Sequence, residues 1–389
     1  MRPFLQSFLH FFTSLRLTVA LLILSMILVF IATLDQVNLG VWAVQMKYFR
    51  SFFVLGRVPG TDVPVPVFPG GYFIGGLLLL NLAAAHVHRF RFSWSKSGLW
   101  LTHFGLILLL LGELFTGLWQ QESQMRLDQG ETKAYSESPL LTELAVIDTT
   151  DPKFDDVVAI PTAALEKPGT IQTPKLPFTI HPVLFYPNST LVMRSQVPNA
   201  APSPADQGFG PQLVALAQPV TYKPNEQNLP TAFLELAGPD GRIGTWLVST
   251  LLTESQSLTC QGHTYELRLR PTRFYHPFSL SLIKFSHDRY PGTDIPKNFS
   301  SRVRLQTPDS RVDREVLIYM NNPLRFGGLT FYQAGFENND RTTVLQVVRN
   351  PSWLLPYVSC VLMGLGLVIQ FGIHLTGFIR RRAAAAASA

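Results

Sequence analysis

The sequence is poor in cysteine, which excludes several kinds of chemistry. Among its 389 residues there are two cysteines, Cys260 and Cys360, and Cys360 lies within a long apolar run. We expect the two thiols to lie in different compartments and not to form a disulfide. Because no Cys-x-x-Cys pair occurs, the chain is not itself a dithiol reductant, and without Cys-x-x-Cys-His it carries no covalently attached haem.

The sequence also lacks the spacings that are typical of a metal centre or of a nucleophilic active site. Between residues 120 and 350 no nucleophile, base and orienting acid stand in a recognisable register. The histidines of this segment show no metal-ligand spacing; they are His181, His263, His276 and His287. We therefore predict that this chain has no catalytic residue of its own.

Charged residues make up 15% of the chain, and they are almost absent from four long apolar runs. Each run has roughly the 20 residues, or more, that a helix needs to cross a hydrocarbon core of about 30 Å. The third run is interrupted by one histidine and one carboxylate, His103 and Glu113. The sequence predicts four transmembrane helices, at 17–34, 70–88, 98–119 and 351–379.

The distribution of basic residues predicts how these helices are oriented. The segments 1–16, 89–97 and 380–389 hold eight basic residues and no acidic residue, and short loops rich in Lys and Arg stay in the cytoplasm. Both termini and the 89–97 turn are therefore predicted inside, and the segments 35–69 and 120–350 outside. Since this explains the net charge of +6, we expect no nucleic-acid partner.

The first apolar run has one alternative interpretation, a cleaved signal peptide. We prefer a membrane anchor, because 17–34 is longer than the apolar region of a signal peptide, and residues 31–36 are a poor cleavage site. The aromatic segment before it, within 1–16, is expected to lie along the inner membrane interface. Membrane lipid is therefore an expected partner.

The exterior segment 120–350 has the pattern of a β-rich domain and is long enough for one or two cores. Residues 265–270 alternate between apolar and polar, and 233–237 and 242–248 are strand-like runs joined by Gly-Pro-Asp-Gly. Proline and glycine recur between such runs, and no long helical periodicity appears. We predict a membrane protein with four transmembrane α-helices and a large, sandwich-like β domain outside.

Three stretches resemble the ResB (CcsB) family of cytochrome c biogenesis proteins. They are Lys284-Phe-Ser-His-Asp-Arg-Tyr-Pro-Gly-Thr-Asp-Ile-Pro-Lys-Asn-Phe-Ser-Ser-Arg-Val, Tyr319-Met-Asn-Asn-Pro-Leu-Arg-Phe-Gly-Gly-Leu-Thr-Phe-Tyr-Gln and Val347-Val-Arg-Asn-Pro-Ser-Trp. The likeness extends through the chain, with three N-terminal spans, a large exterior domain and a last span entered through Arg-Asn-Pro. These motifs are long and far more specific than a glycine pattern.

The resemblance implies a subunit of the system II cytochrome c synthase in the bacterial inner membrane, with its large domain on the periplasmic side. Such proteins work with a ResC (CcsA) membrane partner that carries a tryptophan-rich loop, and together they move haem outward and join it to apocytochrome c. The six tryptophans here are scattered, so this chain is not the complete synthase. A separate thioredoxin-like reductant is also implied, because the chain has no Cys-x-x-Cys.

The resemblance further implies a non-covalent haem b shared with the partner, and no other metal. Candidate axial ligands are, in order, His103, His88 and His86. His103 lies roughly 7 Å inside the third span, and Gly105 beside it allows a flat ring to approach. His86 and His88 are about 200° apart on a helix, so at most one of them faces the bundle. The alternative is that these histidines are interfacial anchors.

Two further groups near the membrane have both a functional and an ordinary explanation. Arg89 and Arg91 are candidate partners of the haem propionates, because guanidinium binds carboxylates in a bidentate fork, although the positive-inside rule also explains them. The intramembrane Glu113 is a candidate for relaying protons or pairing with a cation of the partner. It is equally explained by snorkelling to the outer interface.

The exterior motifs supply candidates for docking of the partner or of apocytochrome c. These are His287, Asp288, Tyr290, Asn322 and Arg325. Proline and glycine in the first motif are also what a turn requires, so we expect these residues to form a docking surface and part of the folding core. An alternative function remains, that of a membrane-anchored apocytochrome c chaperone or scaffold that binds no haem itself.

Overall fold

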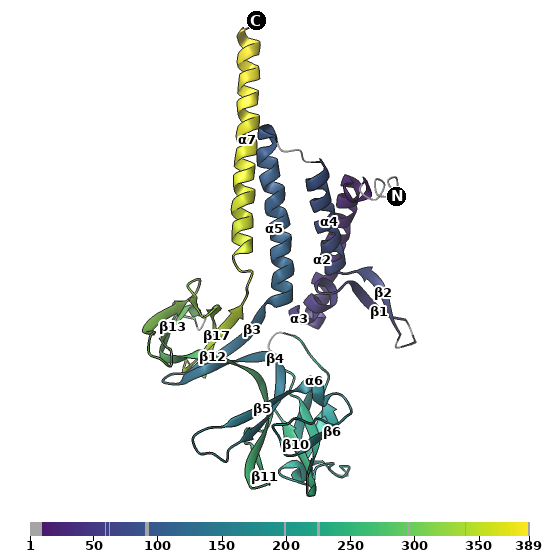
Figure 1. The fold of residues 1–389 in the computed structure, drawn as a ribbon, viewed down its shortest axis with the longest axis vertical. Coiled ribbons are helices and arrows are strands. Elements are labelled where there is room, and N and C mark those ends of the chain that lie inside the picture. Colours follow the sequence, from purple (N-terminus) through teal and green to yellow (C-terminus); the bar gives the residue numbers. More distant parts are fainter. Residues whose placement is uncertain are drawn as a thin grey trace. The chain divides into compact units, whose positions relative to one another are not determined.

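The computed structural model describes residues 10–58, 60–61, 63–89, 93–197, 200–223, 226–293, 296–338 and 340–387 (Figure 1). The chain forms two compact units. We call Met1–Gln121 with Arg349–Ala389 the helical unit, and Glu122–Val348 the β unit. Most of the predicted interfacial segment 1–16, residues 1–9, lies outside the described residues.

The helical unit is built from four apolar helices. They are α2 (Leu15–Leu39), α4 (Gly71–Arg89), α5 (Ser97–Trp119) and α7 (Leu355–Ala387). Within the described residues, three helices, at Leu15–Leu39, Trp94–Trp119 and Leu355–Ala387, are long and apolar enough to cross a membrane, and Gly71–Val87 is a shorter apolar helix. In sequence order each of the four packs against the next (Figure 1).

The segment predicted as an exterior loop, 35–69, is largely ordered. It holds the last turn of α2, the short helix α3 (Val41–Val44), the π-helix η1 (Gln45–Phe49) and the antiparallel hairpin of β1 (Phe53–Arg57) and β2 (Pro64–Pro69). Between α4 and α5, the 3-10 helix η2 (Trp94–Lys96) leads into α5.

Glycines at seven-residue spacing bring α5 and α7 together. Gly98, Gly105 and Gly112 are the buried residues of α5, and seven residues are about two turns, so they lie on one face. A Cβ at Gly105 would lie 2.7 Å from Met363 Cγ of α7, and one at Gly112 would lie 3.0 Å from Leu355 Cβ. Small residues permit such close packing between apolar helices.

We expect Gly105→Leu to weaken the α5–α7 contact by about 1–3 kcal/mol, the usual cost of overpacking. The control is Gly364→Leu, because a Cβ at Gly364 of α7 meets no atom within 4 Å. The measurement is loss of helical circular dichroism as micelles of the purified chain are titrated with SDS. Equal stability of the two variants would contradict this packing.

A buried amide joins the start of α2 to α4. Asn81 of α4 is 3% exposed, and its Nδ2 donates to the carbonyl oxygens of Phe12 (2.7 Å) and Ser14 (3.2 Å). Its Oδ1 accepts from Thr18 Oγ1 at 2.6 Å. The Ser14 side chain caps α2 by accepting from the Arg16 amide. Asn81 thus fixes the point at which the chain turns into α2.

The β unit confirms the predicted β-rich domain. Its largest sheet has ten strands, with the order β14-β13-β12-β4-β3-β17-β16-β15, and with β11 on β12 and β5 on β4. A three-stranded sheet has the order β10-β9-β6, and β7 pairs with β8. The elements are β3 (Gln121–Asp128), β4 (Thr132–Asp148), β5 (Asp156–Pro161), α6 (Thr162–Leu165), β6 (Thr179–Tyr186), β7 (Ser189–Met193), η3 (Arg194–Gln196), η4 (Gly210–Gln212), β8 (Leu213–Ala217), β9 (Thr231–Gly238), β10 (Gly241–Ser249), β11 (Gln256–Cys260), β12 (His263–Arg289), β13 (Pro296–Gln306), β14 (Asp313–Tyr319), β15 (Leu324–Phe326), β16 (Leu329–Glu337) and β17 (Thr342–Arg349).

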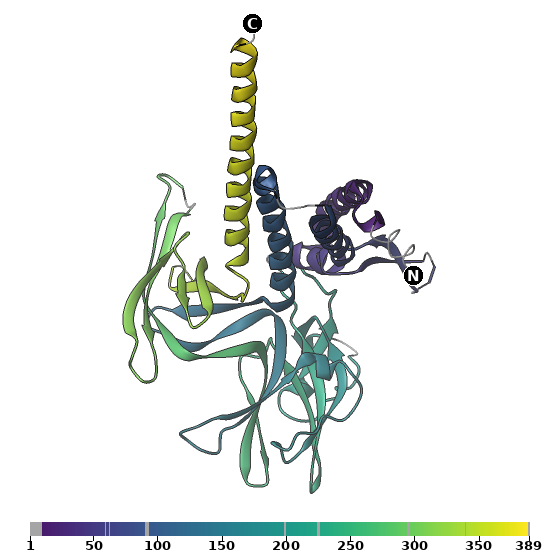
Figure 2. The ribbon, with the colours of Figure 1, turned by 45° about the horizontal axis from the view of Figure 1, so that its top comes forward.

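The long strand β12 passes through two separate hydrophobic cores. Its first part contributes Leu267 and Leu269 to a core shared with β4, β5, β6, β9, β10 and β11. Its last part contributes Leu280 and Leu282 to a core shared with β3, β13, β14, β15, β16 and β17. The β unit is therefore two small β structures that share the strands β4 and β12 (Figure 2).

Polar side chains connect β4 and β12 where the two cores meet. Glu143 and Arg270 form a buried ion pair with 3.1 Å between Oε1 and Nε, and both side chains are 6% exposed. Glu137 and Arg273 pair at 3.0 Å, and the Arg273 guanidinium lies 4.2 Å from the Tyr135 ring centroid. These contacts hold the two strands in register.

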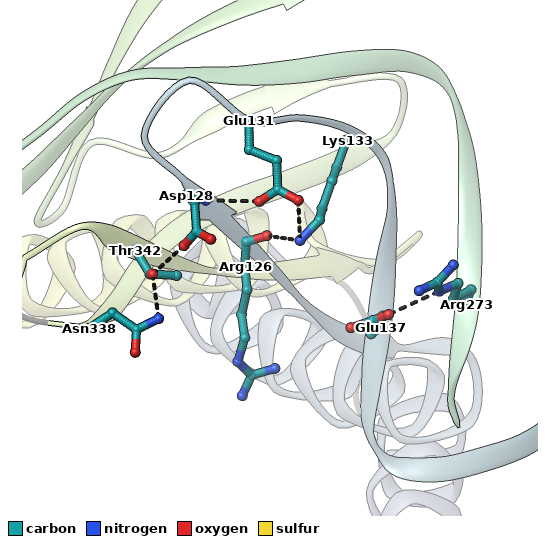
Figure 3. Close-up of polar contacts among 8 residues, drawn as sticks. All are labelled: Arg126, Asp128, Glu131, Lys133, Glu137, Arg273, Asn338 and Thr342. Atoms are coloured by element: carbon teal, nitrogen blue, oxygen red, sulfur yellow. Dashed lines mark hydrogen bonds and ion pairs between the residues drawn. The ribbon is translucent and has the colours of Figure 1, made fainter. Parts of the chain in front are cut away.

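The β3–β4 turn is held by a second set of polar contacts (Figure 3). The Glu131 carboxylate accepts from the Asp128 amide at 2.9 Å and pairs with Lys133 Nζ at 3.0 Å. Lys133 in turn donates to the Arg126 carbonyl oxygen at 2.7 Å. The Thr342 hydroxyl donates to the Asp128 carboxylate, which fastens the turn to β17.

His276 is a half-buried histidine that we expect to make the stability of this unit depend on pH. Its Nε2 lies 3.0 Å from Ser136 Oγ, its ring stacks on Phe278 at 5.4 Å, and burial lowers its pKa below the usual value of about 6.5. As pH falls, the unfolded chain therefore binds a proton at this histidine before the folded chain does. The free energy of unfolding decreases as pH falls through the usual histidine pKa toward the lowered pKa of His276.

We expect the unfolding midpoint of the purified chain, measured by near-ultraviolet circular dichroism, to fall as pH decreases from about 7.5 to about 5. His276→Gln places a neutral side chain at this position, so the variant should lose less stability over the same pH interval. A pH dependence unchanged by His276→Gln would show that this histidine is not responsible.

Candidate functional site: histidines on two adjacent apolar helices

Two of the predicted ligand candidates lie next to each other on neighbouring helices. His86 of α4 and His103 of α5 have ring centroids 6.4 Å apart, with an angle of 27° between the ring planes. His86 is 7% exposed, and its ring centroid lies 4.2 Å from that of Trp100. His103 is half-buried. The contact between α4 and α5 thus brings together two imidazoles and an indole.

The hydrogen bonding of His103 selects the form that binds metals. Its Nδ1 lies 2.8 Å from the carbonyl oxygen of Leu99, one turn earlier in α5. Because a carbonyl oxygen only accepts, Nδ1 carries the proton, and Nε2 is the unprotonated nitrogen of the neutral ring. Histidines that ligate metals are usually oriented in this way by a carbonyl or carboxylate behind them.

Aromatic and apolar residues surround this pair. Trp100 stacks at 6.2 Å on Phe104, with 20° between the planes, and Phe104 is exposed on α5. A porphyrin needs such apolar walls beside a neutral nitrogen donor, so the residues present are suited to holding a haem. Trp100 was missed from the sequence, although its position three residues before His103 places the two on one side of a helix.

The role expected for Gly105 was wrong. The sequence suggested that this glycine leaves room for a flat ring beside His103, but the space next to it is filled by Met363 and Ser359 of α7. Gly105 is therefore a helix-packing residue. The expectation failed because a single helix does not reveal which of its faces meets a neighbour.

Several predicted residues fall at the edge of the described structure. His88 and Arg89 belong to the last turn of α4, but their side chains lie outside the described residues, as does Arg91 altogether. Their ligand and propionate roles stay predictions. Glu113 is exposed on α5 and follows Gly112, which packs on α7. A charge in such an apolar helix costs about 2.5–3.5 kcal/mol at the centre of a bilayer, so a partner or water is expected near it.

The docking candidates of the β unit are of two kinds. The His287 side chain is 7% exposed, stacks on Phe336 at 5.0 Å, and has Nδ1 3.3 Å from Asp340 Oδ1. The His287 side chain is therefore part of the packing of the β unit. Asp288 accepts from Asn298 Nδ2 at 2.8 Å, and the backbone N–H of Asn322 donates to the Tyr319 carbonyl oxygen in the β14–β15 turn. Asp288, Tyr290, Asn322 and Arg325 are all exposed.

One polar cluster was not anticipated. At the end of α2, the Asp35 carboxylate accepts from Tyr48 Oη at 2.6 Å and from Lys47 Nζ at 2.8 Å. Lys47 and Tyr48 belong to η1, so the cluster joins this π-helix to α2. Lys47 and Tyr48 stand more than ten positions after Asp35, in a segment without clear periodicity. The sequence therefore did not indicate that these side chains meet.

Comparison with known proteins agrees with the motifs. Residues 244–343 match the model of the ResB-like family, and this region contains two of the three motifs quoted above. This part of the chain is similar to the ResB-like family. The match confirms the resemblance to this family that the sequence motifs indicated. The matched region runs from β10 to the start of β17.

Two curated relatives are similar to this chain. Protein NrfI of Wolinella succinogenes is 26% identical over 300 residues, which cover 75% of this chain and 29% of the relative. The cytochrome c biogenesis protein CcsB of Synechococcus sp. is 30% identical over 142 residues, which cover 33% of this chain and 32% of the relative. The chain thus spans about a third of the length of these relatives.

Proposed function

We propose that this ResB-like chain is the haem-handling subunit of a system II cytochrome c synthase. It works with a ResC/CcsA-type membrane protein that carries a tryptophan-rich loop, and together they pass haem outward and support its attachment to the Cys-x-x-Cys-His of apocytochrome c. Similarity to a relative named as a cytochrome c biogenesis protein supports a role in cytochrome c biogenesis. The His86–His103 pair is the observation that carries the role in handling haem. A separate thioredoxin-like protein reduces the apocytochrome thiols.

The proposal places the chain in the bacterial inner membrane with α2, α4, α5 and α7 as four spans. The basic segments of the sequence put both termini and the α4–α5 turn in the cytoplasm and the β unit in the periplasm. The shorter α4 crosses beside α2 and α5, against which it packs. His86 lies about 4.5 Å before the end of α4, and His103 about 9 Å after the start of α5. Both histidines are therefore at the cytoplasmic side.

His103 is the ligand in this proposal. With its Nδ1–H donated to the Leu99 carbonyl oxygen, Nε2 would be the nitrogen that binds a haem b held without a covalent bond. His86 is too buried to reach another polypeptide, and it serves with Trp100 as the wall behind His103. The bound haem supplies the porphyrin that is later attached to apocytochrome c. An imidazole of the partner would supply the second nitrogen donor.

The remaining candidates have places in the same proposal. Arg89 ends α4 three residues after His86, and with Arg91 it is suited to the haem propionates at the cytoplasmic side. In the β unit, Tyr290 and Arg325 are exposed and offer a surface to apocytochrome c or to the partner. The chain has no catalytic residue of its own, and ligation takes place in the complex.

The test is to co-express this chain with a CcsA-type protein, purify through a tag on this chain and record the absorption spectrum of the reduced complex. We expect the low-spin haem signature of two nitrogen ligands. A colourless complex that still supports cytochrome c maturation would favour the scaffold alternative and contradict the role in handling haem.

A further inference from the structure

The β1–β2 hairpin projects sideways from the helices of its unit (Figure 1, Figure 2). Near its base Val54 is 4% exposed and packs into the core formed by α2, η1 and α4. Beyond this anchor the strands continue away from the core, with Leu55 opposite Pro66 and Arg57 opposite Pro64. The hairpin is therefore fixed to the helical unit at one end.

The hairpin exposes large apolar side chains that no part of the described chain covers. Exposed fractions are 62% for Phe52, 48% for Phe53, 55% for Leu55 and 64% for Val67. Val67 lies beside Gly56, on the face opposite Leu55. A hairpin of this kind in water has no reason to carry apolar residues on both faces, since one polar face is the normal pattern.

The backbone of the hairpin is also suited to a medium that is poor in hydrogen bonds. Pro64, Pro66 and Pro69 of β2 have no N–H group. Each proline removes one donor that would otherwise need water or a partner strand, and exposed donors are costly in lipid. The same prolines discourage a further strand from pairing with this edge. Addition of a strand from another protein is thus the less favoured occupant.

The apolar surface of the hairpin continues onto the side of α4. The Phe53 ring centroid lies 5.4 Å from that of Phe73, and the Phe52 ring lies 5.9 Å from that of Tyr72. Tyr72 and Phe73 belong to the first turn of α4. Aromatic residues at the end of an apolar helix are typical of a membrane interface, where they lie at the level of the headgroups.

We propose that the β1–β2 hairpin is an interfacial membrane anchor that inserts Leu55 and its apolar neighbours among phospholipids of the outer leaflet. This rests on the membrane placement of α2 and α4 in the proposed function. The ion pair of Lys47 with Asp35 lies at the base of the hairpin, where polar groups meet the headgroups. Anchoring there holds the ends of α2 and α4 at a constant depth.

The test uses spin labels on single cysteines in a Cys260→Ala, Cys360→Ala background. The full chain is placed in liposomes of phosphatidylethanolamine and phosphatidylglycerol, alone and with a CcsA-type protein. Collision with oxygen, which concentrates in hydrocarbon, is compared with collision with a water-soluble nickel chelate. The labelled positions are Leu55 and Val67 of the hairpin, Val29 in the middle of α2, and Phe154, an exposed residue of the β unit.

We expect the oxygen-to-nickel ratio at Leu55 and Val67 to exceed that at Phe154 severalfold and to approach that at Val29. A ratio at Leu55 equal to that at Phe154, with Val29 in lipid, overturns the anchor and leaves the proposed function intact. If the labels at Leu55 and Val67 collide little with either reagent only when the CcsA-type protein is present, a protein covers the hairpin. This result also overturns the membrane anchor. A Val29 label in contact with nickel shows instead that the membrane placement itself is wrong.

Discussion

Replacing His103 by glycine is expected to remove most of the haem from the complex of this chain with a CcsA-type protein. Outer-shell partners of a metal ligand already contribute about 10–100-fold in affinity, so loss of the ligand itself should lower haem retention by at least on the order of 10-fold. Cytochrome c maturation should fall with it. Glycine leaves a space of imidazole size, so added imidazole should restore part of the absorbance by providing the missing nitrogen.

The matched control is His374→Gly. This histidine is also in an apolar helix, α7, where its Nε2 lies 3.0 Å from Gln370 Nε2. We expect its haem spectrum and its maturation activity to be close to those of the unchanged chain. If His103→Gly retains full pigment and maturation, His88 becomes the next ligand to test. Full pigment after removal of His103, His88 and His86 together would falsify haem binding by the histidines of α4 and α5.

Replacing Arg270 by methionine is expected to destabilise the β unit by about 3–5 kcal/mol. The change leaves the Glu143 carboxylate, 6% exposed, without its cation where the two cores meet. The double variant Arg270→Met, Glu143→Leu should recover most of the loss, because it removes both charges from the interior. The measurement is chemical unfolding of the detergent-solubilised chain, followed by near-ultraviolet circular dichroism.

The control is Arg304→Met on β13, which breaks a shorter but exposed ion pair. Arg304 and Asp313 are 2.6 Å apart, with exposed fractions of 50% and 35%. Solvent screens such pairs, so the expected cost is about 0–1 kcal/mol. Losses of equal size for Arg270→Met and Arg304→Met would mean that burial does not decide the strength of these pairs.

The positions of the helices and the character of the β unit were accessible from the sequence because both depend on neighbours along the chain. Uncharged runs indicated apolar helices, and α2, α5 and α7 meet the length for crossing a membrane. Alternation at 265–270 indicated a strand and lies within β12. The motif beginning at Lys284 indicated the family, and the family model matches there.

The candidate site was accessible only in part. His103 and His86 were named from their depth, but nothing in the sequence showed that their rings lie 6.4 Å apart with Trp100 beside them. That arrangement depends on which faces of α4 and α5 meet. The same information was missing for Gly105, whose contact with α7 joins residues more than 250 positions apart.

By itself, the sequence determined where the chain is apolar, where it alternates, which segments are basic and which family it resembles. These properties follow from composition and local period. Only the tertiary structure decided that His86 meets His103, that Arg270 neutralises Glu143 across β12 and β4, and that one strand serves two cores. The physical reason is that such contacts depend on the faces that distant segments present to each other, and packing of the whole chain selects those faces.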